Sequence, residues 1–273
     1  MMKATDFQTN RPIGIFDSGV GGLTVVRQVI KYLPGENIVY FGDLANLPYG
    51  SKSEEQIIRL SVAATKFLMR FNIKILVVGC NSSSAVALAT LRRRFQLPII
   101  GVIEPGVVEA LKVTVNGHIG VIGTRATIIS KAYQNMIHRL NPKIRVSVRS
   151  CPLFVPLVEE GMDKKITLDI VKNYLKPLRN KRIDALILGC THYPMLKKEI
   201  ARVIGNGITL IDSGNEVAVK IKNLLVQKEM LAPAGDFGKV KFYVSDLPRQ
   251  FKKIGRRFLN QDIPRLLKVK LDV

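Results

Sequence analysis

The chain has 273 residues, enough for two lobes of ordinary size, and 47% of them are apolar, which excludes a wholly disordered protein. No apolar run is long enough to cross a membrane, and residues 1–11 lack the apolar core of a secretory signal, so we expect no membrane contact. The three cysteines show no framework spacing, which is typical of proteins from a reducing cytoplasm.

The charge is strongly positive, with 42 Lys and Arg against 21 Asp and Glu, a formal net charge of +21. Such a balance favours contact with nucleic acid, anionic surfaces or acidic small molecules. The excess is spread along the chain, with clusters at 92–94 and 249–270 that do not alternate with aromatic residues. We interpret it mainly as a solvated basic surface. A nucleic acid, or a nucleic-acid enzyme such as a topoisomerase, is kept as an alternative partner.

Apolar runs that predict strands alternate with stretches that predict helices. In the first half we expect strands at 13–16, 38–41, 73–78 and 98–103, and helices at 23–33, 53–71 and 82–95. Ser53, with Gln56 three residues later, is the signature of a capping box. Glu104-Pro105-Gly106 is interpreted as a turn that closes the last of these strands.

A second cycle begins near residue 119. We expect strands at 119–122, 145–150 and 183–188, a helix that runs to about residue 140, and a helix at 166–178. Each half has a polar turn after its first strand and a Gly-Cys turn later. This internal repeat predicts an α/β fold of two pseudo-symmetric, doubly wound lobes with mainly parallel sheets and an active site in the cleft between them.

The tail has no counterpart between the two halves. It is expected to form a helix at 215–229, a strand at 240–244 and a basic helix at 249–260, and to pack on the first lobe. The predicted division is therefore residues 1–104 plus 208–273 for the first lobe and residues 105–207 for the second.

Two cysteines end near-copies of one apolar segment, Cys80 after 73–79 and Cys190 after 183–189. In open α/β sheets ligands bind at the carboxyl ends of strands, so the two thiols are expected to face one substrate. That arrangement suits a base and an acid on opposite sides of a prochiral carbon. Free cysteine is usually a small buried apolar residue, but the matched positions, each before an expected helix start, favour catalysis. Cys151 lacks the pattern and is expected to be structural.

Other polar turns admit two interpretations each. The turn after Asp17 and Ser18 matches no phosphate-loop fingerprint, so nucleotide binding is weakly supported, and Asp17 could serve an amine or a thiol. The loop that carries Tyr49 and Gly50 is either a plain surface loop or a loop that covers substrate. His192 could tune the thiol of Cys190 or act only as a cap, and the histidine count and spacing argue against a metal site.

Together these residues resemble the glutamate racemases of the aspartate/glutamate racemase superfamily over nearly the whole chain. The resemblance is carried by Gly14–Thr24, Tyr40–Asp43, Pro48–Gly50, Gly79–Asn81, Gly101–Gly106, Gly120–Thr124, Gly189–Pro194 and Phe242–Asp246. One departure lies beside Cys80, where the family usually shows Ala-Cys-Asn-Thr and this chain has Gly-Cys-Asn-Ser. Serine keeps the hydroxyl, but the lost methyl group changes the packing of the pocket.

The resemblance implies a racemase that needs no cofactor and no metal and uses Cys80 and Cys190 as its acid and base. Residues that would assist the thiols are Asp17, Glu159 and His192, although Glu159 and Glu160 considered alone are more typical of solvated helix ends. Residues that would contact substrate are Asp17, Ser18, Tyr49, Gly50, Asn81, Ser82, Thr124, Thr191 and His192.

The resemblance also implies a bacterial cytoplasmic enzyme, often a homodimer, that supplies D-glutamate for peptidoglycan. The alternatives are a racemase of aspartate or another acidic amino acid, and a non-catalytic protein that binds nucleic acid or a topoisomerase on this fold.

Overall fold

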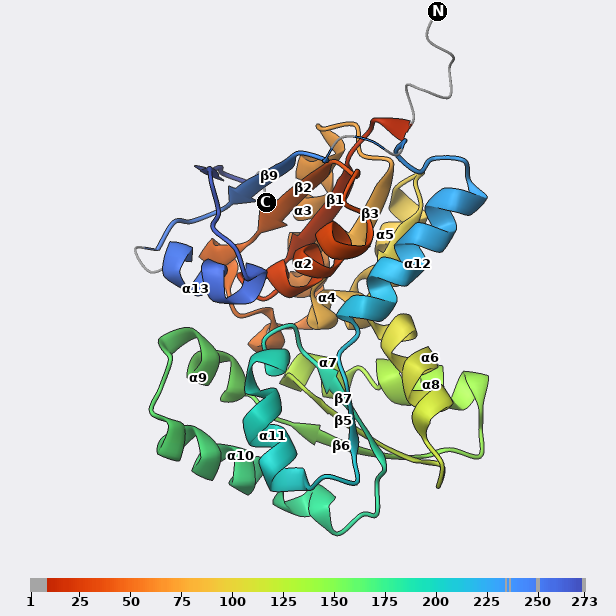
Figure 1. Ribbon diagram of the computed structural model, residues 1–273, viewed down its shortest axis with the longest axis vertical. Helices are drawn as coiled ribbons and strands as arrows, with labels where there is room; N and C mark the ends of the chain where they lie inside the picture. The colour runs from red at the N-terminus through yellow and green to blue at the C-terminus, as the bar shows by residue number, and fades with distance from the viewer. Residues whose placement is uncertain (1–8, 234, 236, 249–250, 272–273) are drawn as a thin grey trace, which may run out of the picture.

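The computed structural model describes residues 9–233, 235, 237–248 and 251–271. Its strands form two sheets, and every pairing in the described part of the chain is parallel (Figure 1). The first sheet has the order β10-β9-β2-β1-β3-β4 and contains β1 (Ile13–Asp17), β2 (Ile38–Gly42), β3 (Ile75–Val78), β4 (Ile99–Gly101), β9 (Val240–Val244) and β10 (Leu266–Lys268). The second has the order β6-β5-β7-β8 and contains β5 (His118–Gly123), β6 (Arg145–Ser150), β7 (Ala185–Gly189) and β8 (Thr209–Ile211).

The two sheets repeat one topology. The order β2-β1-β3-β4 in the first sheet matches β6-β5-β7-β8 in the second, so β3 and β7 hold equivalent places. In each lobe the chain moves to one side of its first strand and then returns to the other. The resulting switch point is where open α/β sheets bind ligands. The predicted fold of two pseudo-symmetric parallel lobes is confirmed.

Helices surround both sheets, and those of the first lobe and the tail lie in the upper half of Figure 1. The α-helices are α2 (Leu23–Tyr32), α3 (Glu54–Met69), α4 (Asn81–Val86), α5 (Leu88–Arg94), α6 (Ile103–Val113), α7 (Arg125–Ile129), α8 (Ala132–Leu140), α9 (Phe154–Glu160), α10 (Lys164–Arg179), α11 (Lys197–Ile204), α12 (Gly214–Gln227) and α13 (Phe251–Leu259). Short 3-10 turns are η1 (Leu44–Asn46), η2 (Tyr49–Ser51) and η3 (Tyr193–Leu196). No helix within the described ranges is both long and apolar enough to span a membrane.

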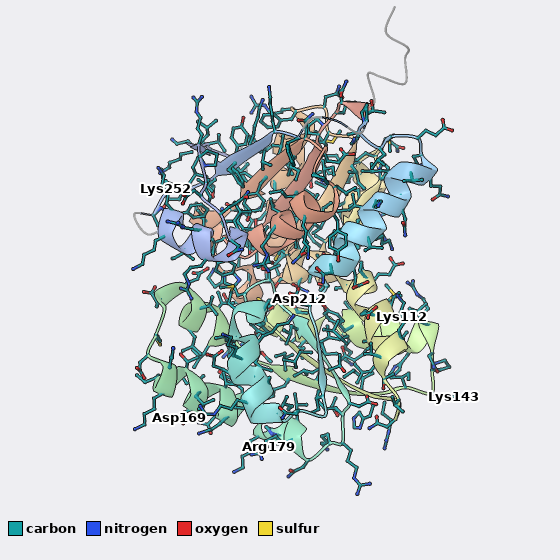
Figure 2. All side chains as sticks on the ribbon, viewed as in Figure 1. Lys112, Lys143, Asp169, Arg179, Asp212 and Lys252 are labelled. Carbon is teal, nitrogen blue, oxygen red and sulfur yellow. The ribbon has the colours of Figure 1, made fainter. Side chains whose placement is uncertain are left out.

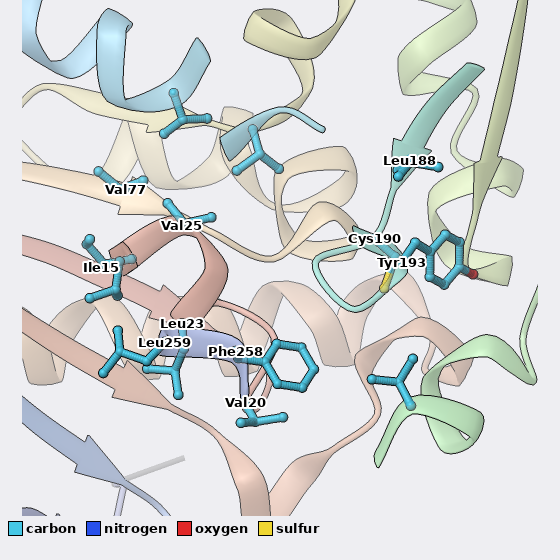
Figure 3. Packing of buried hydrophobic residues seen from close by; sticks show 14 of the residues in the cluster. Ile15, Val20, Leu23, Val25, Val77, Leu188, Cys190, Tyr193, Phe258 and Leu259 are labelled. Carbon is cyan, nitrogen blue, oxygen red and sulfur yellow. The ribbon is translucent and has the colours of Figure 1, made fainter. Parts of the chain in front are cut away.

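Strand β1 shows how the first core is built. Its alternate side chains point to opposite faces of the sheet, so Ile13 and Ile15 enter one apolar cluster and Phe16 enters another. The first cluster continues through Leu23 of α2 and Phe258 of α13 towards Cys190, and Figure 3 shows these side chains from close by. The core thus extends from the tail through the first lobe to the end of a strand in the second.

The tail packs on the first lobe, as expected, because β9 pairs with β2 along its whole length and α13 packs on α2. Strand β10 was not predicted and extends this edge of the sheet. Residues 249 and 250, the expected start of the basic helix, lie outside the described residues. Strand β8 pairs with β7 of the second sheet. This pairing favours a boundary after residue 211 between the second lobe and the returning tail. The predicted boundary, which assigned residues 208–273 to the first lobe, stays a prediction.

The helices differ from the prediction at several places. Glu104-Pro105-Gly106 is not a turn but belongs to α6, where Pro105 sits in the first turn and its missing N–H removes no helical hydrogen bond. The single helix expected at 82–95 is broken at Ala87 into α4 and α5. The single helix expected to run to about residue 140 is likewise two helices, α7 and α8, separated at Ser130 and Lys131. Helix α11 was not predicted. The Ser53 cap is confirmed, since its side chain accepts a hydrogen bond from the backbone N–H of Gln56 at 3.3 Å.

Candidate active site

The candidate site lies where the carboxyl ends of both sheets meet. Strands β1, β3, β5 and β7 end beside Ser18, Cys80, Thr124 and Cys190, which all line one cavity. The complete lining is Ser18, Leu47, Pro48, Tyr49, Gly50, Cys80, Asn81, Ser82, Thr124, Val155, Cys190, Thr191 and His192. The centre of a water molecule can reach only about 20 Å³ of this cavity, space for about one water. The cavity is therefore nearly closed, and any ligand larger than water needs the lobes to separate.

Cys80 is the buried N-cap residue of α4, and its Sγ lies 3.6 Å from Ser18 Oγ. Burial raises the pKa of this thiol to about 11, and the nearby Asp17 carboxylate adds to the effect. The hydrogen bonds of Cys80 with Ser83 and Ser18 act in the opposite direction but are weaker. In the closed site Cys80 is therefore a protonated thiol at neutral pH.

Cys190 has a different partner. Its Sγ lies 3.9 Å from His192 Nδ1, and His192 Nε2 lies 2.7 Å from the Glu159 carboxylate. Burial lowers the pKa of His192, but its hydrogen bonds with Cys190 and Glu159 outweigh burial and raise that pKa to about 10. The ring of Phe258 from α13 meets the His192 ring edge to face at 5.3 Å between centroids. A protonated imidazole is thus fixed beside the sulfur of Cys190.

From the sequence we expected a helix to start directly after Cys190, and that prediction is wrong. A 3-10 turn begins at Tyr193, and α11 begins only at Lys197. His192 therefore supplies the positive charge beside Cys190, where a helix N-terminus was expected. Cys151 is buried and does not line the cavity, in agreement with a structural role.

Asp17 lies beneath the cavity and links the two lobes. Its carboxylate accepts hydrogen bonds from the backbone N–H of Gly19 at 2.9 Å and from the Thr191 hydroxyl at 3.3 Å. Burial raises the pKa of Asp17, and the charge of His192 offsets part of that rise. Asp17 is fully buried and is not among the residues that line the cavity, so it can act on substrate only after a rearrangement.

The loop with Tyr49 and Gly50 lines one side of the cavity, and its role in covering substrate stays a prediction. The Tyr49 hydroxyl donates to Asp43 at 2.6 Å, and Asp43 also accepts a hydrogen bond from Ser245 of the tail at 2.6 Å. A Cβ atom added to Gly50 would lie 2.7 Å from Thr124 Cγ2, so only glycine lets this loop reach the second lobe.

Ser82 also joins the lobes at Thr124, with 2.9 Å between their hydroxyl oxygens. Asn81 forms a second link, since its amide Nδ2 donates to the Tyr133 hydroxyl at 2.9 Å. Tyr133 and Phe258 were not singled out from the sequence. Each acts through contacts between distant segments, and no local spacing in the sequence marks them.

Nearly all the predicted site residues thus gather around one cavity, and Glu159 reaches it through His192. Among the described residues, no group of three or more His, Cys, Asp or Glu side chains is placed to hold a metal ion. The arrangement offers proton exchange between a bound group and two sulfur atoms, one beside a cation and one beside a carboxylate.

Comparison with known proteins shows which family the chain belongs to. The model of the Asp/Glu/hydantoin racemase family matches residues 13–221. A glutamate racemase from Geobacter metallireducens is 46% identical over 263 residues, which cover 96% of this chain and 97% of the relative. The chain belongs to the glutamate racemases of this family.

Solved structures of glutamate racemases share the whole architecture. The isoform RacE1 from Bacillus anthracis superposes with a TM-score of 0.93 at 39% identity, over 97% of this chain and 99% of that one. The enzyme from Francisella tularensis, solved in complex with D-glutamate, has a TM-score of 0.91 at 39% identity, with the same coverage.

Proposed function

We propose that the protein interconverts L-glutamate and D-glutamate without a cofactor, by proton transfer between the α-carbon and two thiols. The observation that carries the proposal is the pair Cys80 and Cys190 at equivalent strand ends of two facing lobes, on one closed cavity. Membership of the glutamate racemases supports glutamate as the substrate. The product would supply D-glutamate for peptidoglycan, the role of this family.

In the proposed reaction one sulfur, as thiolate, takes the α-proton, and the opposite thiol gives a proton to the other face of the carbanion. The total number of protons is unchanged, and the roles exchange with the handedness of the substrate. A protonated His192 lies 3.9 Å from Cys190, which favours proton removal by that sulfur, while Cys80 as a thiol is ready to donate. The opposite direction requires Cys80 to lose its proton first.

The surroundings fit a substrate with two carboxylates. Ser18, Asn81, Ser82, Thr124 and Thr191 place hydroxyl and amide groups on the cavity. Such donors can bind carboxylate oxygens and stabilise the charge that develops on the α-carboxylate as the proton leaves. Closure of the lobes excludes water and strengthens these interactions.

The direct test is incubation of the purified protein with L-glutamate and no added cofactor, followed by circular dichroism. We expect the optical activity to decay to zero, and L-aspartate to react at least about tenfold more slowly because its side-chain carboxylate is one methylene nearer the α-carbon. If aspartate loses its optical activity as fast as glutamate or faster, the assignment of glutamate as the preferred substrate is wrong. No reaction of either amino acid would contradict a racemase.

A cytoplasmic homodimer is part of the same proposal, and sedimentation of the purified protein tests its oligomeric state. The net charge of +21 supports nucleic acid as a second partner. Figure 2 shows basic side chains on both lobes, with Lys143 and Arg179 on the second and Lys252 on α13 beside the first. A gel shift that weakens with salt would support this partner, and no shift at low salt would exclude it.

A further inference from the structure

Tyr133 occupies a position that the proposed reaction does not explain by itself. It is the second residue of α8 in the second lobe, and its side chain is fully buried. The ring packs among Ile119, Val121 and Ile187 of the central strands β5 and β7. A buried tyrosine needs a partner for its hydroxyl group, and that partner comes from the other lobe.

The partner is Asn81, the residue after Cys80. Its Nδ2 donates to the Tyr133 hydroxyl at 2.9 Å, and both side chains are buried. Asn81 also lines the cavity. An amide nitrogen carries two N–H groups, so the bond to Tyr133 fixes the amide in place and leaves one N–H group for another acceptor.

The ring of the same tyrosine contacts the loop of the other thiol. A Cβ atom added to Gly189 would lie 2.6 Å from the Ile122 carbonyl oxygen and 3.1 Å from Tyr133 Cε2, so the ring packs directly against this glycine beside the strand backbone. Gly189 is the last residue of β7 and directly precedes Cys190. The pKa of Tyr133 is raised, first by burial and further by the proximity of Cys190, and this agrees with the packing.

We propose that Tyr133 is a positioning residue that ties the two cysteine loops together. Its hydroxyl orients the Asn81 amide on the loop of Cys80, and its ring packs against Gly189 on the loop of Cys190. The inference rests on the proposed two-thiol reaction. Its consequence is that one side chain sets the placement of a substrate-binding amide and the separation of the two sulfur atoms. It also closes the lobes, because the hydrogen bond joins α4 to α8.

A double-mutant cycle tests the hydroxyl tie. Tyr133→Phe keeps the ring and removes the hydroxyl, which leaves the Asn81 amide without its buried partner. We expect kcat/KM for glutamate to fall about tenfold in this variant, and more in Asn81→Ala. In the Asn81→Ala background Tyr133→Phe should lower kcat/KM by less than about twofold, because the hydroxyl acts through Asn81. Independent, multiplicative effects would overturn the proposal, as would unchanged kinetics of Tyr133→Phe.

Alkylation of the thiols gives a second readout that does not depend on activity. The substrate-free protein is treated with iodoacetamide at pH 8, and each cysteine is quantified by peptide mass spectrometry. Tyr133→Phe should raise the labelling rate of Cys80 and Cys190 at least about threefold, because buried thiols react when the lobes open. Labelling of Cys151 should not change.

Thr65→Val is the matched control, since it removes a buried hydroxyl whose hydrogen bond, 2.8 Å to the Ser61 carbonyl, lies within α3. It should alter neither labelling nor kinetics. If wild type does not racemise glutamate but Tyr133→Phe is labelled faster, the proposed function is refuted. The link that Tyr133 makes between the two cysteine loops would still stand. Unchanged labelling would refute the tie even if racemisation is confirmed.

Discussion

At the scale of single residues, the two thiols of the site are alike in position and different in surroundings. Cys80 lies near the Asp17 carboxylate, and burial raises its pKa to about 11. Cys190 lies beside His192, whose pKa is about 10 because the Cys190 and Glu159 contacts outweigh burial. The resting site is therefore arranged for one direction of proton transfer. The rate in the direction that uses Cys80 as base should rise with pH up to about 11, where this thiol loses its proton.

Replacement of Glu159 by glutamine tests this arrangement, since it removes the carboxylate 2.7 Å from His192 Nε2. We expect the pKa of His192, followed by NMR, to fall below about 9, and kcat at pH 8 to fall about tenfold. Glu160→Gln is the control, because the neighbouring Glu160 has no contact with His192 among the interactions of the described residues. A His192 pKa that stays at about 10 in Glu159→Gln would contradict the assignment.

The same pKa has a consequence for stability. The folded pKa of His192, about 10, exceeds the usual value of 6.5 in the unfolded chain, so the folded protein binds more protons between these values. This contribution to the free energy of unfolding is complete below about pH 6.5 and is lost as pH rises through 10. Urea denaturation should therefore show Glu159→Gln to be less stable than wild type at pH 7 and nearly equal to it at pH 10.5.

At the scale of elements, the turn from β1 into α2 fits closely under the Cys190 loop. A Cβ atom added to Gly21 would lie 2.6 Å from His192 Nδ1 and would also clash with the Thr191 hydroxyl. Gly21→Ala should therefore displace His192 and lower kcat/KM at least about tenfold. Gly207→Ala, where no atom lies within 4 Å of the added carbon, is the control. Wild-type kinetics in Gly21→Ala would show that this close fit has no catalytic importance.

The elements also show what the sequence could and could not predict. Strands such as β1, β3 and β7 were predictable because a buried parallel strand reads as an apolar run, and a Gly-Cys end marks two of them. Helix α6 was missed because Pro and Gly together suggest a turn, whereas Pro105 occupies a helical first turn.

The site was predictable where its residues follow strand ends. It was not predictable where a contact joins distant segments, because sequence patterns report only local periodicity. Asn81 and Tyr133 are 52 positions apart, and Phe258 reaches His192 from the tail. Their importance depends on how the lobes and the tail pack, which no motif in the chain records.

At the scale of the whole molecule, one buried ion pair in the first lobe also binds the segment after α12, where the chain has returned from the second lobe. Lys74 Nζ lies 2.6 Å from the Glu36 carboxylate, with both side chains almost inaccessible, and it also donates to the Met230 carbonyl after α12 at 2.7 Å. Burial lowers the pKa of Lys74, and Glu36 opposes that effect. The Glu36 carboxylate therefore helps Lys74 to keep its charge in this buried position.

Glu36→Ala should destabilise the protein by about 3–5 kcal/mol, because it leaves a buried ammonium group without its carboxylate. The comparison is Asp169→Ala, which breaks an exposed pair with Lys172 and should cost less than about 0.5 kcal/mol. Urea denaturation of both variants measures the difference. A loss below about 1 kcal/mol in Glu36→Ala would show that the pair does not fasten the fold.

The central claim is that two thiols from two lobes exchange one proton each with the α-carbon. Its most direct test is α-deuteration of L- and D-glutamate in D₂O by wild type, Cys80→Ser and Cys190→Ser, followed by NMR with circular dichroism. We predict that wild type incorporates deuterium while it racemises either enantiomer, and that each folded serine variant racemises at less than about 1% of that rate. Near-normal racemisation by either variant would contradict the two-thiol reaction.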